Sequence, residues 1–302
     1  MDFKERISPF SSLAYKYERI ETKRGSRPIP PAGFRNIRLE LSYDGHAFCG
    51  YQYQPHGRSV QETVTQAWTQ LTKEQVLLFG CSRLDAKVSA NHFVLNLYSQ
   101  THHSCDRILR SLNGILQTTL KYPISIYSCT DMEPHFHARF DSIGKHYRYL
   151  VWYGRGQHAL FGPHCWQLRS NIGPQNMASL ARKFEGKHNF SAFRAQDCTA
   201  VSTERTIHKV DFWVHPRMPE LMVLDFWGEG FLKNMIRNIS GTILDAATNK
   251  LSESAIDEAF IHGNRELVGQ CAPAHALVLE RVYYLQDEYN TDAKNGVRIF
   301  LS

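Results

Sequence analysis

The sequence predicts an α+β protein made of two successive β-α-β-β-α-β units, each following the ferredoxin-like pattern. Short segments in which apolar and polar residues alternate are typical of strands, and longer segments with apolar residues at helical spacing lie between them. The order of these segments is the same in both halves of the chain. We therefore expect a duplicated fold with joined sheets and a central cleft between the halves.

The first unit opens with a strand over residues 37–43. A helix over residues 59–73 begins at a capping box, in which Ser59 accepts from the amide of Glu62, and its apolar residues recur at helical spacing. The remaining expected elements are a strand over 76–81, a polar loop over 81–90, a strand over 91–99, a helix from about 105 to 117 and a strand over 123–128.

The second unit repeats this order with little sequence identity. Its expected elements are a strand over 145–152, a helix over 175–184, paired strands over 206–214 and 221–227 around a turn with Pro216 and Pro219, a long helix over 232–250, a short helix over 253–262 and a strand over 276–285. The predicted domains are thus a subdomain at 34–141 that carries the loop, a subdomain at 142–288 and a tail at 289–302.

The N-terminal residues 1–33 form a basic arm that ends in a proline-rich stretch, with a short helix expected around residues 12–20. The whole chain has 302 residues, of which 42% are hydrophobic and 21% charged, and its formal net charge is +6. These totals are those of a soluble globular protein. The positive balance favours an anionic partner without selecting nucleic acid over an acidic protein surface.

The seven cysteines are scattered and form no Cys-x-x-Cys pair, so we expect reduced thiols and no metal cluster. His135 and His137 lack a third ligand at suitable spacing, which favours a structural or RNA-facing role over a metal site. No run is apolar enough to span a bilayer and no signal peptide is recognisable. These observations predict a cytoplasmic protein with no membrane association.

Four side chains stand out as candidates for chemistry. Arg83 and Asp85 lie in the polar loop between two strands, although such a pair alone is more typical of a solvated turn. Arg237 falls about 140° from the apolar stripe of its helix, where it could pair with a carboxylate or simply be exposed. Tyr147, in the first strand of the second unit, could stack on a base or be an ordinary strand tyrosine.

Six motifs, found in order over residues 37–285, resemble those of the TruA family of tRNA pseudouridine synthases. The loop resembles the family's Gly-Arg-Thr-Asp-x-Gly-Val-His-Ala. The other matching stretches are Tyr43-Asp-Gly-His-Ala-Phe-Cys-Gly-Tyr-Gln52 with Ser59-Val-Gln-Glu62, Phe136-His-Ala-Arg-Phe140 with His146-Tyr-Arg-Tyr149, Phe193-Arg-Ala195, Phe231 with Met235-Ile-Arg-Asn-Ile-Ser-Gly241, and Ala272-Pro-Ala-His-Ala-Leu277.

The resemblance implies an isomerase that converts uridine to pseudouridine in tRNA without a cofactor. Asp85 would be the catalytic carboxylate, Arg237 would pair with it, and Tyr147 would pack against the uracil. Arg83 would help hold the target nucleotide out of its stack, and Arg194 would be a further substrate-binding residue. The family also implies action in the anticodon arm, near positions 38–40 of the tRNA, and a homodimer.

The departures from the family pattern are concentrated in the loop itself, where Ser82, Leu84, Lys87 and Ser89 replace glycine, threonine, glycine and histidine. If the second glycine position requires a positive φ, Lys87 costs about 1–2 kcal/mol there. Two alternatives therefore stay open: a divergent, catalytically weak or inactive tRNA-binding protein on the same scaffold, and a protein-interaction scaffold. An aspartate, two arginines and a tyrosine with implied chemical roles are all present, which favours the enzyme.

Overall fold

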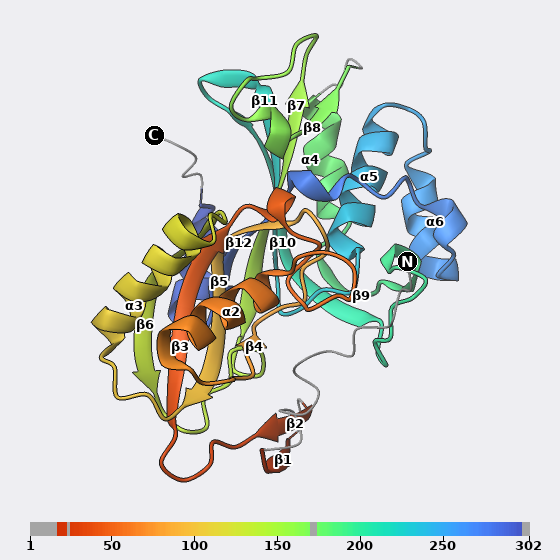
Figure 1. Ribbon diagram of the computed structural model, residues 1–302. Helices are drawn as coiled ribbons and strands as arrows, with labels where there is room; N and C mark the ends of the chain where they lie inside the picture. Colours follow the sequence, from red (N-terminus) through yellow and green to blue (C-terminus); the bar gives the residue numbers. More distant parts are fainter. Residues whose placement is uncertain (1–16, 23–24, 170–173, 298–302) are drawn as a thin grey trace, which may run out of the picture. The chain divides into compact units, whose positions relative to one another are not determined.

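The structure is a computed structural model that describes residues 17–22, 25–169 and 174–297 (Figure 1). The chain divides after Ser142 into two compact units. In the described part of the chain, none of the helices has both the length and the apolar character needed to cross a membrane.

The first unit contains an antiparallel sheet in the order β6-β3-β5-β4. In chain order this is the fourth, first, third and second strand, which is the arrangement of the ferredoxin-like pattern. The predicted β-α-β-β-α-β unit is therefore confirmed. Its elements are β3 (Arg35–Tyr43), α2 (Val60–Thr72), β4 (Phe79–Gly80), β5 (Ser89–Ser99), α3 (Cys105–Asn113) and β6 (Ile124–Met132).

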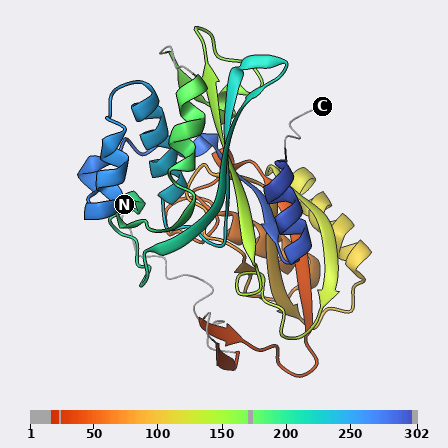
Figure 2. The same cartoon turned by 180° about the vertical axis from the view of Figure 1, so that it is seen from behind.

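Helices α2 and α3 cover one face of this sheet, which is turned toward the viewer in Figure 1 and away in Figure 2. The alternation that predicted β3 places Ile37, Leu39 and Leu41 in the core, where they are fully buried. The Ser59 hydroxyl accepts from the Glu62 amide at 3.1 Å and so caps α2 as predicted. After Asn113, helix α3 continues as a π-helical turn over Gly114–Thr119.

Strand β4 is shorter than the predicted strand over residues 76–81. Val76 and Leu78 are buried, but the Leu78 carbonyl accepts from the Gln61 side chain at 3.4 Å rather than from a strand. The apolar run that predicted a longer strand therefore reflects burial of its side chains, and ladder pairing is limited to Phe79 and Gly80.

The second unit has the strand order β12-β7-β11-β10, the same pattern, with β9 added beside β10 and β8 paired in parallel with β7. Pro219 lies within β11 rather than in the turn before it. The elements are β7 (Gly144–Tyr153), β8 (Trp166–Leu168), α4 (Pro174–Arg182), β9 (Gly186–Asn189), β10 (Glu204–His215), β11 (Met218–Gly228), α5 (Met235–Ala247), α6 (Ser254–His262), β12 (Leu277–Tyr283) and α7 (Gln286–Asn295). The α+β class is confirmed, while the joining of the sheets and the cleft stay predictions.

Both ends of the described chain are more ordered than the sequence indicates. Strands β1 (Arg19–Thr22) and β2 (Gly25–Pro28) form an antiparallel hairpin in the basic arm, so the predicted helix is wrong for residues 17–20, and its residues 12–16 lie outside the described part. The Tyr98 hydroxyl donates to the Pro28 carbonyl at 3.0 Å and holds the hairpin on the first unit. Helix α7 includes residues that were expected to belong to a tail.

Candidate active site

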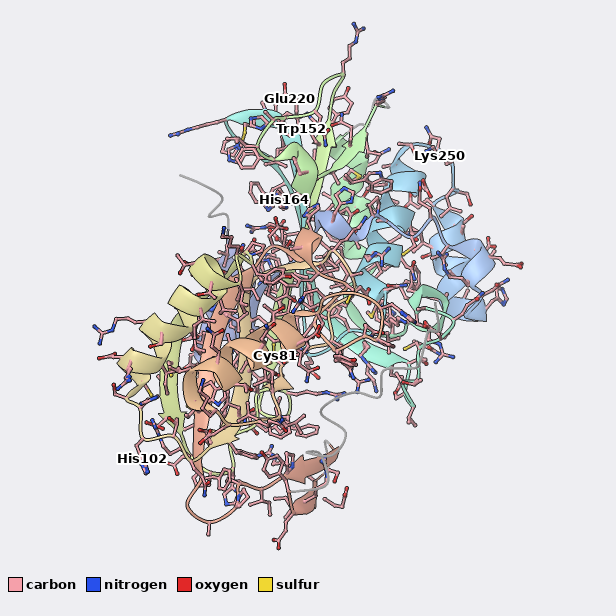
Figure 3. All side chains as sticks on the ribbon, viewed as in Figure 1. Cys81, His102, Trp152, His164, Glu220 and Lys250 are labelled. Atoms are coloured by element: carbon pink, nitrogen blue, oxygen red, sulfur yellow. The ribbon has the colours of Figure 1, made fainter. Side chains whose placement is uncertain are left out.

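The loop over residues 81–90 leaves β4 at Cys81, labelled in Figure 3, and enters β5 at Ser89. Backbone hydrogen bonds fix it on both sides. The Cys81 amide donates to the Val94 carbonyl at 2.9 Å, and the Tyr51 amide donates to the Leu84 carbonyl at 3.1 Å. The loop is therefore held by the segment 43–52, which carries the second family motif.

Two glycines of that segment let it approach the loop backbone closely. A Cβ on Gly50 would lie 2.8 Å from the Leu84 carbonyl oxygen, and a Cβ on Gly45 would lie 2.4 Å from the Val88 carbonyl carbon. Gly50 also has a φ of +117°, which L side chains rarely adopt. The physical reason for glycine at both positions is thus the backbone of the loop.

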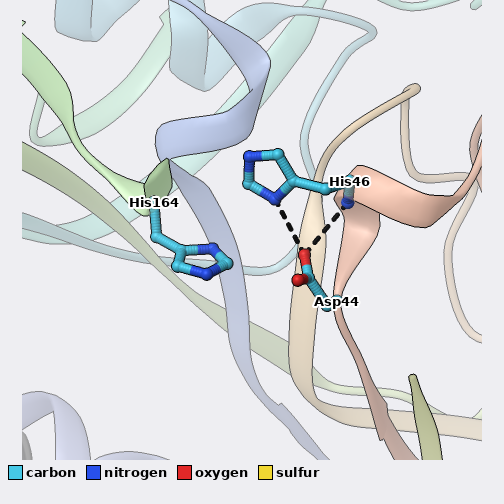
Figure 4. Close-up of side chains that lie close together, drawn as sticks. All are labelled: Asp44, His46 and His164. Atoms are coloured by element: carbon cyan, nitrogen blue, oxygen red, sulfur yellow. Dashed lines mark hydrogen bonds and ion pairs between the residues drawn. The ribbon is translucent and has the colours of Figure 1, made fainter. Parts of the chain in front are cut away.

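Asp44 shapes the turn that brings Gly45 to the loop. Its carboxylate accepts from the backbone amide of His46 at 3.0 Å and lies 2.8 Å from the Nδ1 atom of the same residue (Figure 4). This interaction caps a 3₁₀ helix over Gly45–Ala47.

Lys87 has a φ of +68°, so the position of the family's second glycine does require a left-handed residue in this chain. The condition attached to Lys87 is therefore met, while its cost of about 1–2 kcal/mol stays a prediction. Ser89, in place of the family's histidine, accepts from the Gly45 amide at 2.9 Å and is buried. This departure supplies a local contact between the loop and the motif segment.

Asp85 and Arg83 occupy alternate positions of the loop around a buried Leu84. Asp85 is half-buried, Arg83 is exposed, and the Asp85 carbonyl accepts from the Val88 amide at 3.2 Å. The loop therefore presents a half-buried carboxylate and a solvent-accessible guanidinium two residues apart in the chain, on a backbone held at several points.

Tyr147 lies on β7 between Phe226 of β11 and Leu279 of β12. It is only 5% exposed, and its ring meets that of Phe231 edge to face, with 5.3 Å between ring centroids. Such packing fixes the plane of the ring. Phe231, which belongs to the fifth family motif, thus positions Tyr147, which belongs to the third.

Arg237, on α5, is half-buried and tied rather than freely exposed. Its Nε donates to the Ala272 carbonyl at 2.8 Å and its Nη1 to the Asn234 side chain at 3.0 Å. Asn234 has a φ of +60° and precedes the helix, which starts at Met235 rather than at the predicted residue 232. The surface-arginine alternative is wrong, because these contacts set the orientation of the guanidinium.

Arg194 follows a 3₁₀ helix over Ser191–Phe193 and is half-buried. The Phe193 carbonyl accepts from the Asn238 side chain at 2.8 Å, and the Ala195 amide donates to the Lys233 carbonyl at 2.9 Å. The backbone on both sides of Arg194 is thereby attached to the start of α5, the helix of Arg237.

The predicted residues divide between the two units: Arg83 and Asp85 belong to the first, and Tyr147, Arg194 and Arg237 belong to the second. The pairing of Asp85 with Arg237 stays a prediction. The sequence reasoning missed the positioning roles of Gly45, Gly50, Phe231 and Asn234. All four lie in or beside the quoted motifs, but only the contacts reveal their roles.

Comparison with known proteins places this chain in a family. Residues 180–285 match the family model described as tRNA pseudouridine synthase. The tRNA pseudouridine synthase A of Geotalea daltonii is 34% identical over 250 residues, or 83% of this chain and 100% of that protein. The tRNA pseudouridine synthase A of Citrifermentans bemidjiense is 35% identical over 251 residues, which cover 83% of this chain and 98% of that protein. That of Acetivibrio thermocellus is 33% identical over 250 residues, which cover 83% of this chain and 100% of that protein. These matches confirm the resemblance of the motifs, and the chain belongs to the TruA family of tRNA pseudouridine synthases.

Proposed function

We propose that this chain isomerises uridine to pseudouridine in tRNA and that Asp85 is its catalytic carboxylate. The reaction breaks the bond between N1 of uracil and C1′ of the ribose, turns the base and forms a bond from C5 to C1′. C5 loses its proton and N1 gains one, so atoms and charge balance within the substrate, and the reaction needs no cofactor.

A carboxylate suits this reaction because cleavage builds positive charge on the sugar. An anion can stabilise that charge, trap it as an ester or remove a neighbouring proton. The observation that best supports Asp85 in this role is the fixed backbone of its loop, with Gly45 and Gly50 against it. A displacement of about 1 Å in such a site can cost on the order of 100-fold in rate.

The other residues supply orientation. Arg237, already aligned by Ala272 and Asn234, is proposed to pair with Asp85 and keep it ionised. Tyr147 is proposed to pack against the uracil. Arg83 and Arg194 are proposed to bind the tRNA, with Arg83 holding the target nucleotide outside its stack.

The proposed substrate is the anticodon arm, at positions 38–40. We further propose a homodimer that acts in the cytoplasm, since two subunits can grip one arm. Light scattering tests the dimer, because the measured mass should be twice that of one chain. Transcripts in which cytidine replaces the uridines at 38–40, and in which the remaining uridines carry tritium at C5, should release no tritium.

The central experiment uses tRNA labelled with tritium at C5 of uridine. We expect the unmutated protein to release tritium and Asp85→Asn to release none, while both bind tRNA. Asp106→Asn, which changes an exposed carboxylate on α3 of the same unit, is the matched control and should retain release. Release by Asp85→Asn would show that another group performs the catalysis.

The second candidate is a tRNA-binding protein that has lost most of its activity. The strained Lys87 and the buried Leu84, both departures within the loop, favour this alternative. Tight binding of tRNA by the unmutated protein with no release of tritium would establish it. Failure to bind tRNA at low salt would instead favour an interaction scaffold.

A further inference from the structure

The segment from Glu133 to Ser142 is held in place by two buried asparagines of the neighbouring strands. The side-chain amide of Asn36 donates to the Phe136 carbonyl at 2.8 Å, and that of Asn96 donates to Asn36 Oδ1 at 2.9 Å. The Ala138 amide in turn donates to Asn96 Oδ1 at 2.9 Å. Because both asparagines are at most 3% exposed, this network defines the path of the segment firmly.

This segment lies against β4, the strand that leads into the loop of Asp85. The rings of Phe79 and His137 have centroids 5.2 Å apart, and Phe79 pairs with Asn96 in the sheet. Arg139 follows His137 by two residues and Arg83 follows Phe79 by four. Both arginines are exposed, and the positive charge of Arg83 acts on the guanidinium of Arg139.

The carboxylate of Asp141, in the same segment, is already neutralised by other partners. Arg27 of the N-terminal hairpin lies 2.6 Å from it, and the His137 amide donates to its other oxygen at 2.8 Å. Within the described part of the chain, neither Arg83 nor Arg139 has a carboxylate partner. Two neighbouring guanidinium groups therefore keep a positive charge that the protein does not compensate.

The electrostatics of Arg139 agree with this arrangement. Arg139 is an exposed residue whose guanidinium is only partly shielded from water. This shielding and, second, the charge of Arg83 hold the pKa of the Arg139 guanidinium below its usual range. Burial lowers the pKa of His137 to about 4, so this ring is neutral at pH 7 and its Nδ1 accepts from the Arg139 amide at 3.1 Å. The centroid of the Phe140 ring lies 5.8 Å from the Arg139 guanidinium carbon, within the range of a cation–π contact.

We propose that Arg139 is a further substrate-positioning residue, which together with Arg83 binds a backbone phosphate of the RNA close to the target uridine. Two planar guanidinium groups match the tetrahedral oxygens of a phosphate, and the bound anion relieves their mutual repulsion. The proposal deepens the proposed function and rests on it, since RNA is the ligand that brings a phosphate to this loop.

The experiment compares the unmutated protein with Arg139→Gln, Arg139→Lys and Arg110→Gln, the last being an exposed arginine on α3. Loss of one phosphate contact should lower the slope of log K for tRNA binding against log salt by about one. We expect Arg139→Gln to raise KM about tenfold, since a charge-assisted contact is worth about that factor, and to leave kcat within about twofold. Arg139→Lys should restore most of the slope, and Arg110→Gln should behave as the unmutated protein.

Thermal unfolding separates binding from a structural role. If Arg139 serves the ligand, Arg139→Gln has the same or a higher Tm, because a repulsion between like charges has been removed. A lower Tm with an unchanged salt slope would overturn the proposal, as would unchanged KM and slope. Since the slope is measured on binding, it decides this inference even if the unmutated protein forms no pseudouridine, which would count against the proposed function alone.

Discussion

The α-carbon of Gly50 faces the carbonyl oxygen of Leu84 so closely that a methyl group on it would come within 2.8 Å of that oxygen. The same carbonyl accepts from the Tyr51 amide at 3.1 Å. The carbonyl of Leu84, the residue before Asp85, is therefore contacted by two consecutive residues of one short segment. This contact links the second family motif to the loop of Asp85 by direct backbone packing.

Gly50→Ala should displace the loop and reduce activity. The substitution adds a methyl group against backbone that cannot move alone, and it places alanine at a φ of +117°. Strain of this kind costs about 1–3 kcal/mol, and a shift of about 1 Å in the carboxylate can lower kcat about 100-fold. Tritium release and thermal unfolding measure the two effects.

Gly114→Ala is the matched control, because a Cβ there meets nothing within 4 Å and the residue has a helical φ. This variant should have unchanged kcat and a Tm that is the same or higher. Equal kcat in Gly50→Ala and the unmutated protein would mean that the loop tolerates the displaced backbone.

Lys87→Gly should stabilise the protein. A left-handed residue that is not glycine carries about 1–2 kcal/mol of strain, which the substitution removes. Glycine also makes the unfolded chain more flexible, which offsets about 0.5–1 kcal/mol of that stabilisation. We therefore expect the free energy of unfolding to rise by up to about 1 kcal/mol, with kcat equal to or above that of the unmutated protein. Urea unfolding and tritium release are the measurements.

Lys73→Gly provides the comparison, since Lys73 ends α2 with a φ of +64° and lies outside the loop. A similar gain in stability without any change in kcat is expected for it. If Lys87→Gly lowers both stability and activity, the lysine side chain has a role that outweighs its backbone strain.

Asp225→Ala should destabilise the second unit strongly. The buried Asp225 carboxylate accepts from Arg148 Nε at 2.8 Å and Trp213 Nε1 at 2.7 Å, and lies 2.8 Å from His146 Nε2. Removing it leaves the buried Arg148 charge with less compensation, which costs about 3–5 kcal/mol. Asp257→Ala, which breaks an exposed ion pair with Lys183, should change the unfolding free energy little. Equal losses in the two variants would contradict a special role for burial.

Local chemistry explains what the sequence alone could predict. The hydroxyl of Ser59 and the alternation in β3 act over a few residues, so α2 and β3 follow from the sequence directly. The left-handed Asn234 and the short β4 depend on contacts made elsewhere in the unit, and an apolar run does not distinguish packing from strand pairing. For the candidate site, the loop and the helix pattern single out Asp85 and Arg237, and the resemblance supplies their expected roles. The contacts of Gly50 and the charge balance around Arg139 exist only in three dimensions.

The protein should lose stability on mild acidification because of His137. Its pKa of about 4 in the folded state lies below the ordinary value of 6.5, so the unfolded chain binds the proton first. The stability from the neutral ring is complete above pH 6.5 and is lost as pH falls from 6.5 toward 4. Between pH 7 and pH 5 this single group should lower the free energy of unfolding by about 2 kcal/mol.

His137→Asn tests this, because an amide oxygen can replace Nδ1 as the acceptor for the Arg139 amide without titrating in this range. The variant should lose about 2 kcal/mol less than the unmutated protein between pH 7 and pH 5, as measured by urea unfolding at both values. His102→Asn, at an exposed position of the same unit, should leave the pH dependence unchanged. Parallel pH profiles for His137→Asn and the unmutated protein would show that the His137 ring is protonated as readily in the fold as in the unfolded chain.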